Sequence, residues 1–209
     1  MGRISPGGFE NVSMSDNEII EALTPVVDAL EVANIRYRVG GSVASSALGV
    51  ARSTLDVDVA CEIREEHVDA FVGRLSSDYY IDADMVRDAI RRRASFNVVH
   101  FRTMIKVDVF VQKGDAFSRT SFERATRKPL EDVPGARAFD LTTPEDIILH
   151  KLAWYELGGR ISERQWSDVL GVMRVQAEVL DWKYLEEWAG ALDLAALLSK
   201  AKAAAQASP

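Results

Sequence analysis

The stretch that decides the fold is residues 40–61, which read GGSVASSALGVARSTLDVDVAC. A Gly-Gly-Ser turn follows a short apolar run, and small residues ending at a further glycine then favour a helical turn. After it, apolar side chains alternate with acidic or small ones, which is the period of a strand with one buried face. The elements expected here are a strand at 35–39, a helical turn at 42–48 and a strand at 55–63.

Outside this stretch the pattern alternates between helices and strands up to about residue 142. A capping box at residues 15–18 opens an apolar-periodic helix, in which Pro25 either introduces a kink or starts a second helix capped by Thr24. Residues 114–128 read as a charged helix or loop. The other elements expected are helices at 65–75 and 84–93 and strands at 79–81, 95–100, 104–111 and 137–141. The strands at 95–100 and 104–111 are expected to form a hairpin.

From Thr143 onward the sequence becomes helical. Thr143 and Pro144 form a strong helix start, with acidic residues in the first turn. The helices expected in this part are 143–157, 162–177, 182–189 and 191–204. The sequence thus predicts an α/β (α+β) class, with a mixed β-sheet that carries helices on one face and a C-terminal helical lobe. We expect a leader or disordered arm at 1–14, an α/β domain at 15–142 and the helical lobe at 143–204.

Composition and charge narrow the function classes. The chain has 209 residues and a formal net charge of −7, which disfavours general binding of long nucleic acid. There is one cysteine, Cys61, so no disulfide framework forms within the chain, and a buried thiol in a reducing, cytoplasmic setting is expected. No apolar run is long enough to suggest a membrane span, so no membrane partner is predicted.

Three carboxylates mark the predicted chemistry. Asp56 and Asp58 are two apart on one expected strand, so both side chains leave the same face. Asp108 lies on another expected strand, also opposite the valines. If these strands are neighbours, the three carboxylates converge, and a hard divalent cation such as Mg²⁺ or Mn²⁺ relieves their repulsion. The alternative for the Asp-x-Asp pair alone is a solvated edge strand.

The Gly-Gly-Ser turn supplies features suited to phosphate. Gly40 and Gly41 allow close approach of the backbone, and Ser42 adds a hydroxyl at a helix start, where amide groups favour negative charge. Arg52, between the turn and the acidic pair, is a candidate partner for a phosphate. A Gly-Gly pair alone is more often simply a turn, so the ordered set of turn, arginine and acids carries the hypothesis.

This ordered set resembles the nucleotidyltransferase superfamily related to DNA polymerase beta. The first motif of that superfamily stands here as Gly41-Ser42 followed by Asp56-x-Asp58, and its third carboxylate matches Asp108. The resemblance implies a mixed sheet flanked by helices. It also implies Mg²⁺-dependent transfer of a nucleoside monophosphate from a nucleoside triphosphate, with release of pyrophosphate.

The arrangement is most similar to stand-alone bacterial nucleotidyltransferases, including toxin-like members of abortive-infection systems. The shared runs are Gly40 to Ala44 and Arg52 to Asp58, with a softer match in the C-terminal helices at Thr143 to Asp146 with Lys151, and Glu163-Arg164 with Asp168. By this resemblance Lys151 reaches the triphosphate; the alternative is a lysine at a helix edge with its ammonium in water. Asp168 is expected to pair with Lys151 or Arg164.

Two function hypotheses remain open at this point. In the first, Asp56 and Asp58 hold metal, Asp108 completes the site and favours deprotonation of the acceptor hydroxyl, and the turn cradles the nucleotide, ATP or another NTP. The acceptor is then a tRNA 3′ end, a protein side chain or a small molecule such as an aminoglycoside, with an antitoxin partner if the chain is a toxin. In the second, the chain is a catalytically silent nucleotide-binding or partner protein with the same fold.

Overall fold

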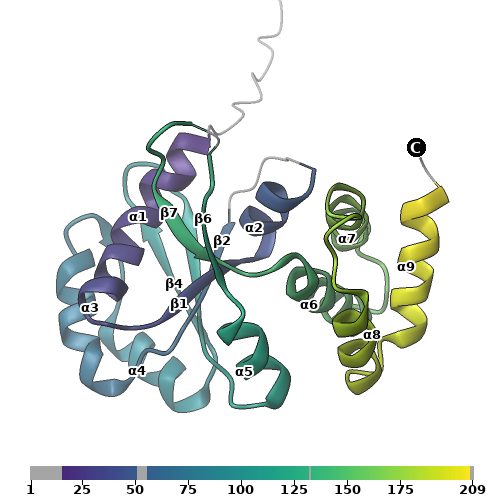
Figure 1. Ribbon diagram of the computed structural model, residues 1–209. Coiled ribbons are helices and arrows are strands. Elements are labelled where there is room, and N and C mark those ends of the chain that lie inside the picture. Colours follow the sequence, from purple (N-terminus) through teal and green to yellow (C-terminus); the bar gives the residue numbers. More distant parts are fainter. Residues whose placement is uncertain (1–15, 51–55, 132, 208–209) are drawn as a thin grey trace, which may run out of the picture.

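The computed structural model describes residues 16–50, 56–131 and 133–207, and Figure 1 shows their arrangement. A sheet lies between helices, and a group of helices from the C-terminal part of the chain packs beside it. In chain order the elements are α1 (Asp16–Val32), β1 (Tyr37–Gly40), α2 (Gly41–Leu48), β2 (Asp56–Cys61), η1 (Glu65–His67), α3 (Val68–Leu75), β3 (Tyr79–Tyr80), α4 (Ala83–Arg92), β4 (Ser95–His100), β5 (Lys106–Val111), α5 (Ala116–Glu123), β6 (Thr126–Pro129), β7 (Ala138–Leu141), α6 (Pro144–Leu157), α7 (Glu163–Val175), α8 (Trp182–Ala191) and α9 (Ala195–Ala207).

The strands of the described residues form one seven-stranded mixed sheet in the order β3-β4-β5-β2-β1-β7-β6. The pairs β2–β5 and β1–β7 are parallel, and the other neighbouring pairs are antiparallel. The expected hairpin of β4 and β5 is confirmed. On its other side β5 pairs with β2, so the two strands that carry the predicted carboxylates are neighbours at the centre of the sheet.

One face of the sheet is covered by α1, α3 and α4, which together enclose the first hydrophobic core. The strands contribute the apolar members of their alternating pattern, and Cys61 is buried among them as a free thiol. This burial raises the pKa of Cys61 to about 12. The strand residues that line this core include Tyr37, Val39, Val57, Val59, Phe96, Val98, Val107 and Val109.

The prediction of helices on one face only is wrong at α5. Tyr37 and Val39 point into the first core, so the alternate residues Arg36 and Arg38 point to the opposite face. There their guanidinium groups lie 5.3 and 5.8 Å from the ring centroid of Phe122 on α5. Helix α5 therefore covers part of the second face.

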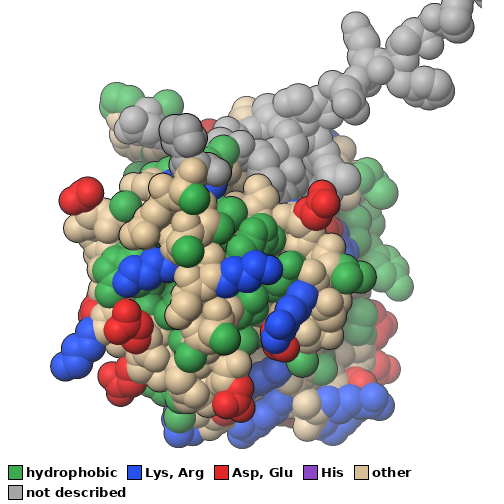
Figure 2. Space-filling view, turned by 90° about the vertical axis from the view of Figure 1, so that its right-hand side faces the viewer, with side chains coloured by type: hydrophobic (Ala, Val, Ile, Leu, Met, Phe, Trp, Pro, Cys, Tyr) green, Lys and Arg blue, Asp and Glu red, His purple; other side chains and the backbone are tan. Residues whose placement is uncertain are grey.

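A second hydrophobic core fills the helical lobe of α6, α7, α8 and α9, and it also receives Ala44 and Leu48 from α2 and Phe117 from α5. Because these earlier elements join it, the boundary at Thr142 stays a prediction. On the side that Figure 2 shows, basic, acidic and apolar side chains are interspersed. None of the described helices combines the length and apolar character needed to cross a membrane.

Two details of the sequence-based element assignment need correction. Pro25 lies inside one helix, α1, and Thr24 does not start a second one. Leu23, Val26 and Val27 are fully buried on both sides of this point, so packing holds the two halves together. In addition, residues 126–129 form an edge strand, β6, which ends in a proline. Proline is tolerated there because an edge strand has a backbone side that needs no partner.

Candidate active site

The Gly-Gly turn lies directly against one of the predicted carboxylates. Gly40 ends β1 and is paired in register with Asp58 on β2, and Gly41 begins α2. Gly41 has a φ of +56°, and a Cβ added to it would lie 1.5 Å from the Asp58 Oδ2. Only glycine fits this position, since it alone offers both the left-handed backbone and the missing side chain.

The three predicted carboxylates lie on neighbouring strands. Asp58 is directly opposite Asp108 in the parallel pairing of β2 and β5, and Asp56 is opposite Lys106. Because side chains two residues apart leave a strand on the same face, all three acids face the side of the sheet away from the first core. The convergence predicted from the two acidic runs is therefore present at the level of strand and face.

The ammonium of Lys106 lies between two of these acids. Its Nζ is 2.8 Å from Asp108 Oδ2 and 3.5 Å from Asp56 Oδ1. The hydrogen bond to Asp108 is the main reason why the pKa of Lys106 is raised, so the lysine is charged at neutral pH. The acidic cluster thus contains its own positive charge.

Asp58 is the most constrained of the three acids. Burial, and then the nearby Asp108 carboxylate, raise the pKa of Asp58 above its ordinary value, whereas the charge of Lys151 acts in the opposite direction. Burial of a carboxylate beside a second carboxylate is costly for folding. Asp58, with its raised pKa and its place under a glycine turn, is therefore a candidate functional residue.

Helices α6 and α7 bring further polar groups to the turn and to Asp58. Arg164 donates through Nη2 to the Ser42 Oγ over 2.9 Å. Lys151 forms an ion pair with Asp168, with 2.7 Å between Nζ and Oδ2, and donates to Gln165 Oε1 over 3.4 Å. This contact confirms the predicted pairing of Asp168 with Lys151, and the two side chains are only 7% and 6% exposed.

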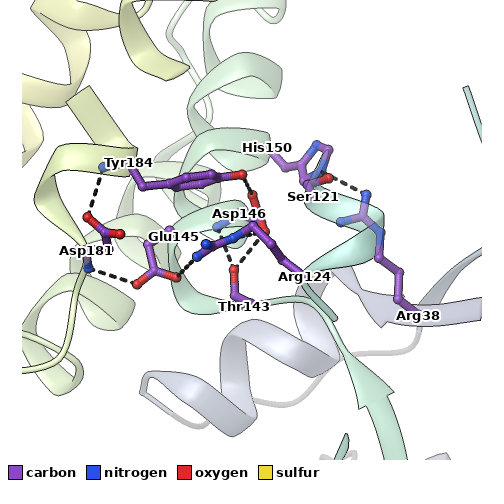
Figure 3. A network of polar contacts seen from close by, with 9 residues as sticks. All are labelled: Arg38, Ser121, Arg124, Thr143, Glu145, Asp146, His150, Asp181 and Tyr184. Carbon is purple, nitrogen blue, oxygen red and sulfur yellow. Dashed lines mark hydrogen bonds and ion pairs between the residues drawn. The ribbon is translucent and has the colours of Figure 1, made fainter. Parts of the chain in front are cut away.

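The start of α6 is fixed by a polar network drawn in Figure 3. Asp146, which is fully buried, accepts hydrogen bonds from Thr143 Oγ1 over 2.8 Å and from the Tyr184 hydroxyl over 2.7 Å. Arg124 pairs with Glu145 over 3.1 Å and lies 3.8 Å above the Tyr184 ring centroid. These contacts join α5, α6 and α8, and they hold in place the helix α6, which carries Lys151.

No protein-family model matches the chain, and no curated protein does. Among solved structures, an antigenic nucleotidyltransferase-like protein from Paracoccidioides brasiliensis matches with a TM-score of 0.55 and 16% identity over 90% of this chain and 94% of that chain. The antibiotic-resistance factor ANT(2″)-Ia matches in its solution structure with a TM-score of 0.51 and 15% identity, over 92% of this chain and 97% of that chain. Its crystal structure with adenylyl-2″-tobramycin matches with a TM-score of 0.53 and 14% identity, over 84% and 97%.

The chain has the nucleotidyltransferase fold. The predicted fold class, a mixed sheet flanked by helices with a C-terminal helical lobe, is therefore confirmed. At these identities the likeness establishes the fold alone.

The three carboxylates on the sheet, Asp56, Asp58 and Asp108, have the ligand atoms that a divalent cation needs. Carboxylate oxygens are the ligands that Mg²⁺ and Mn²⁺ prefer, and the Lys106 ammonium shows that Asp56 and Asp108 already share a cation. As they stand, no three acidic, histidine or cysteine side chains among the described residues are gathered closely enough to hold a metal ion. A bound metal would therefore require rearrangement of side chains on the same face, with Asp56, Asp58 and Asp108 as ligands.

Sequence reasoning overlooked some of these contacts. Lys106 shares a strand face with Asp108 at a spacing of two, a signal that was available, but its reach to Asp56 depends on cross-strand register. Arg164 and Asp168 are one helical turn apart, yet nothing in their spacing indicates Ser42 as a partner. The predicted phosphate partner Arg52 lies outside the described residues.

Proposed function

We propose that the chain is a metal-dependent nucleotidyltransferase, which moves a nucleoside monophosphate from a nucleoside triphosphate to an acceptor. The observation that carries the proposal is that Asp58 and Asp108 lie side by side, in register on two parallel strands. Gly41 lies directly against Asp58, where no residue with a Cβ would fit. The parts needed to bind a triphosphate and to bear its charge then lie on one face of the sheet.

In the proposed reaction an acceptor hydroxyl oxygen attacks the α-phosphorus. The new oxygen–phosphorus bond forms while the bond from the α-phosphorus to the bridging oxygen of the β-phosphate breaks, and pyrophosphate leaves with that electron pair. Asp108 accepts the hydroxyl proton. Asp56, Asp58 and Asp108 would hold a Mg²⁺ or Mn²⁺ ion, which would supply positive charge to the phosphate oxygens. The chain's own contribution is orientation and electrostatics, as in phosphoryl transfer generally.

The other predicted site residues that the structure describes each have a role in this proposal. Gly40, Gly41 and Ser42 cradle the triphosphate through the amide groups at the start of α2. Arg164 holds the Ser42 hydroxyl in place over 2.9 Å. Lys151 supplies a positive charge near Asp58, where the leaving phosphates are expected. Asp56 and Asp58 would hold the metal, and Asp108 would complete its set of ligands.

The choice of acceptor is the open part of the proposal. A similar structure contains adenylyl-2″-tobramycin, the adenylylated form of a small molecule, which supports ATP as donor and a small-molecule acceptor. A tRNA end, a protein side chain and an antitoxin partner remain proposals that only the sequence resemblance supports. The alternative, a catalytically silent nucleotide-binding protein, is disfavoured because Asp56, Asp58 and Asp108 are all present.

The test is transfer of label from two matched sets of nucleotides. The protein is incubated with Mg²⁺, a cell lysate and each NTP labelled either at the α- or at the γ-phosphate. Nucleotidyl transfer places the α-label, and never the γ-label, on an acceptor. Label from the γ-position would indicate phosphoryl transfer, and binding of NTP with no transfer of either label would support the silent alternative.

A further inference from the structure

Lys106 is placed where a metal ligated by the same acids would be. Its ammonium bridges Asp108 Oδ2 at 2.8 Å and Asp56 Oδ1 at 3.5 Å. The bridge links neighbouring strands, since Lys106 is paired in register with Asp56 and lies two residues before Asp108 on β5. Backbone pairing therefore places the Lys106 residue beside Asp56 at the centre of the sheet.

The surroundings of this bridge distinguish it from an ordinary surface pair. The Asp108 side chain is only 21% exposed, and Asp58 beside it is partly buried and lies against Gly41. Three carboxylates on one face repel one another, and a single ammonium leaves the cluster with a net negative charge. Lys106 thus compensates part of a charge that the sheet would otherwise hold with difficulty.

We propose that Lys106 and a divalent cation compete for Asp56 and Asp108, so that Lys106 weakens metal binding until a nucleotide is present. This inference rests on the proposed function, because it assumes the metal site of that reaction. The lysine side chain is 38% exposed and has a flexible stem, so it can swing into solvent when a metal enters. The triphosphate, which is strongly negative, then offsets the loss of the lysine bridge and favours entry of the metal together with the nucleotide.

The inference is tested by titrating Mn²⁺ alone into the full chain and following free Mn²⁺ by electron paramagnetic resonance. The variants are Lys106→Met and Lys106→Gln, with Lys128→Met on the exposed edge strand β6 as the matched control. Removing a unit charge a few ångströms from the metal should tighten Mn²⁺ binding about ten-fold in both Lys106 variants. Lys128→Met should leave the affinity unchanged. Thermal unfolding verifies that every variant is folded.

An added Asp58→Asn variant separates the two proposals. Suppose that wild-type protein binds Mn²⁺, that Asp58→Asn weakens this binding, and that both Lys106 variants bind Mn²⁺ no more tightly than wild type. The proposed role of Lys106 is then wrong, while the proposed metal site stands. If neither wild-type protein nor the Lys106 variants bind Mn²⁺, both the role of Lys106 and the proposed metal site are wrong. Tighter Mn²⁺ binding in both Lys106 variants, with no change in Lys128→Met, supports the inference.

Discussion

Gly41 lies so close to Asp58 that a Cβ on it would be 1.5 Å from the carboxylate Oδ2. The turn and the acid therefore form one unit, and neither can change without moving the other. The backbone of Gly41 is also left-handed, with a φ of +56°. Both constraints come from this single position, and both are open to experiment.

Gly41→Ala should displace Asp58 and therefore reduce the rate of nucleotide transfer far more than a glycine substitution away from the site does. Gly135→Ala is the matched control, because Gly135 has a φ of +80° but no atom within 4 Å of an added Cβ. Both variants should lose about 1–2 kcal/mol of unfolding free energy from the backbone alone. Equal transfer rates in the two variants would show that contact with Asp58 does not matter for the site.

How far the sequence alone predicts this structure can be judged from particular residues. The period of two around Asp56, Asp58 and Asp108 correctly indicated strands with one polar face, because alternation follows directly from strand geometry. The parallel pairing of β2 with β5 was stated only as a condition. It depends on the intervening hairpin, which places β5 between β4 and β2, and single-strand patterns do not encode strand order.

Contacts between distant segments were the least predictable part. The bridge from Lys106 to Asp56 needs the register of two strands, and that from Arg164 to Ser42 needs the packing of α7 against α2. Strand β6 was missed because its charged residues and Pro129 disfavour strands. The cap at Thr143, in contrast, was predictable, since capping depends on residues only three apart.

The buried pair of Lys151 and Asp168 should be important for stability. Asp168→Ala leaves the Lys151 ammonium buried without its carboxylate, and we expect a loss of about 3–5 kcal/mol in urea unfolding. The control is Glu186→Ala, which removes an exposed partner 3.6 Å from Lys202 in the same lobe and should cost about 1 kcal/mol or less. If the two variants are equally stable, the buried pair has no special role.

His150 should make the protein less stable in acid. Burial, and then the Arg38 guanidinium whose Nη2 lies 3.0 Å from His150 Nε2, lower the pKa of His150 to about 3, while Lys113 lowers it and Asp115 raises it to smaller degrees. The unfolded chain, with a pKa near 6.5, therefore binds a proton that the folded chain does not. Stability is complete above about pH 6.5 and decreases as the pH falls toward 3.

His150→Gln removes this proton uptake and keeps an acceptor for Arg38. Between pH 7 and pH 5 the wild-type protein should lose about 2 kcal/mol more unfolding free energy than the variant. Chemical denaturation at both pH values measures this difference, and the titration of carboxylates common to both proteins cancels. Parallel pH profiles would mean that His150 takes up a proton while folded.

The central claim, that Asp58 and Asp108 form the reacting site, is tested most directly by pyrophosphate release. Wild-type protein, Asp58→Asn and Asp108→Asn are assayed with Mg²⁺, NTP and lysate, beside Asp84→Asn, whose side chain is 95% exposed on α4. We predict a loss of at least about 100-fold in both site variants, with thermal unfolding at or above the wild-type temperature, and no loss in Asp84→Asn. Release at the wild-type rate from either folded site variant would contradict the claim.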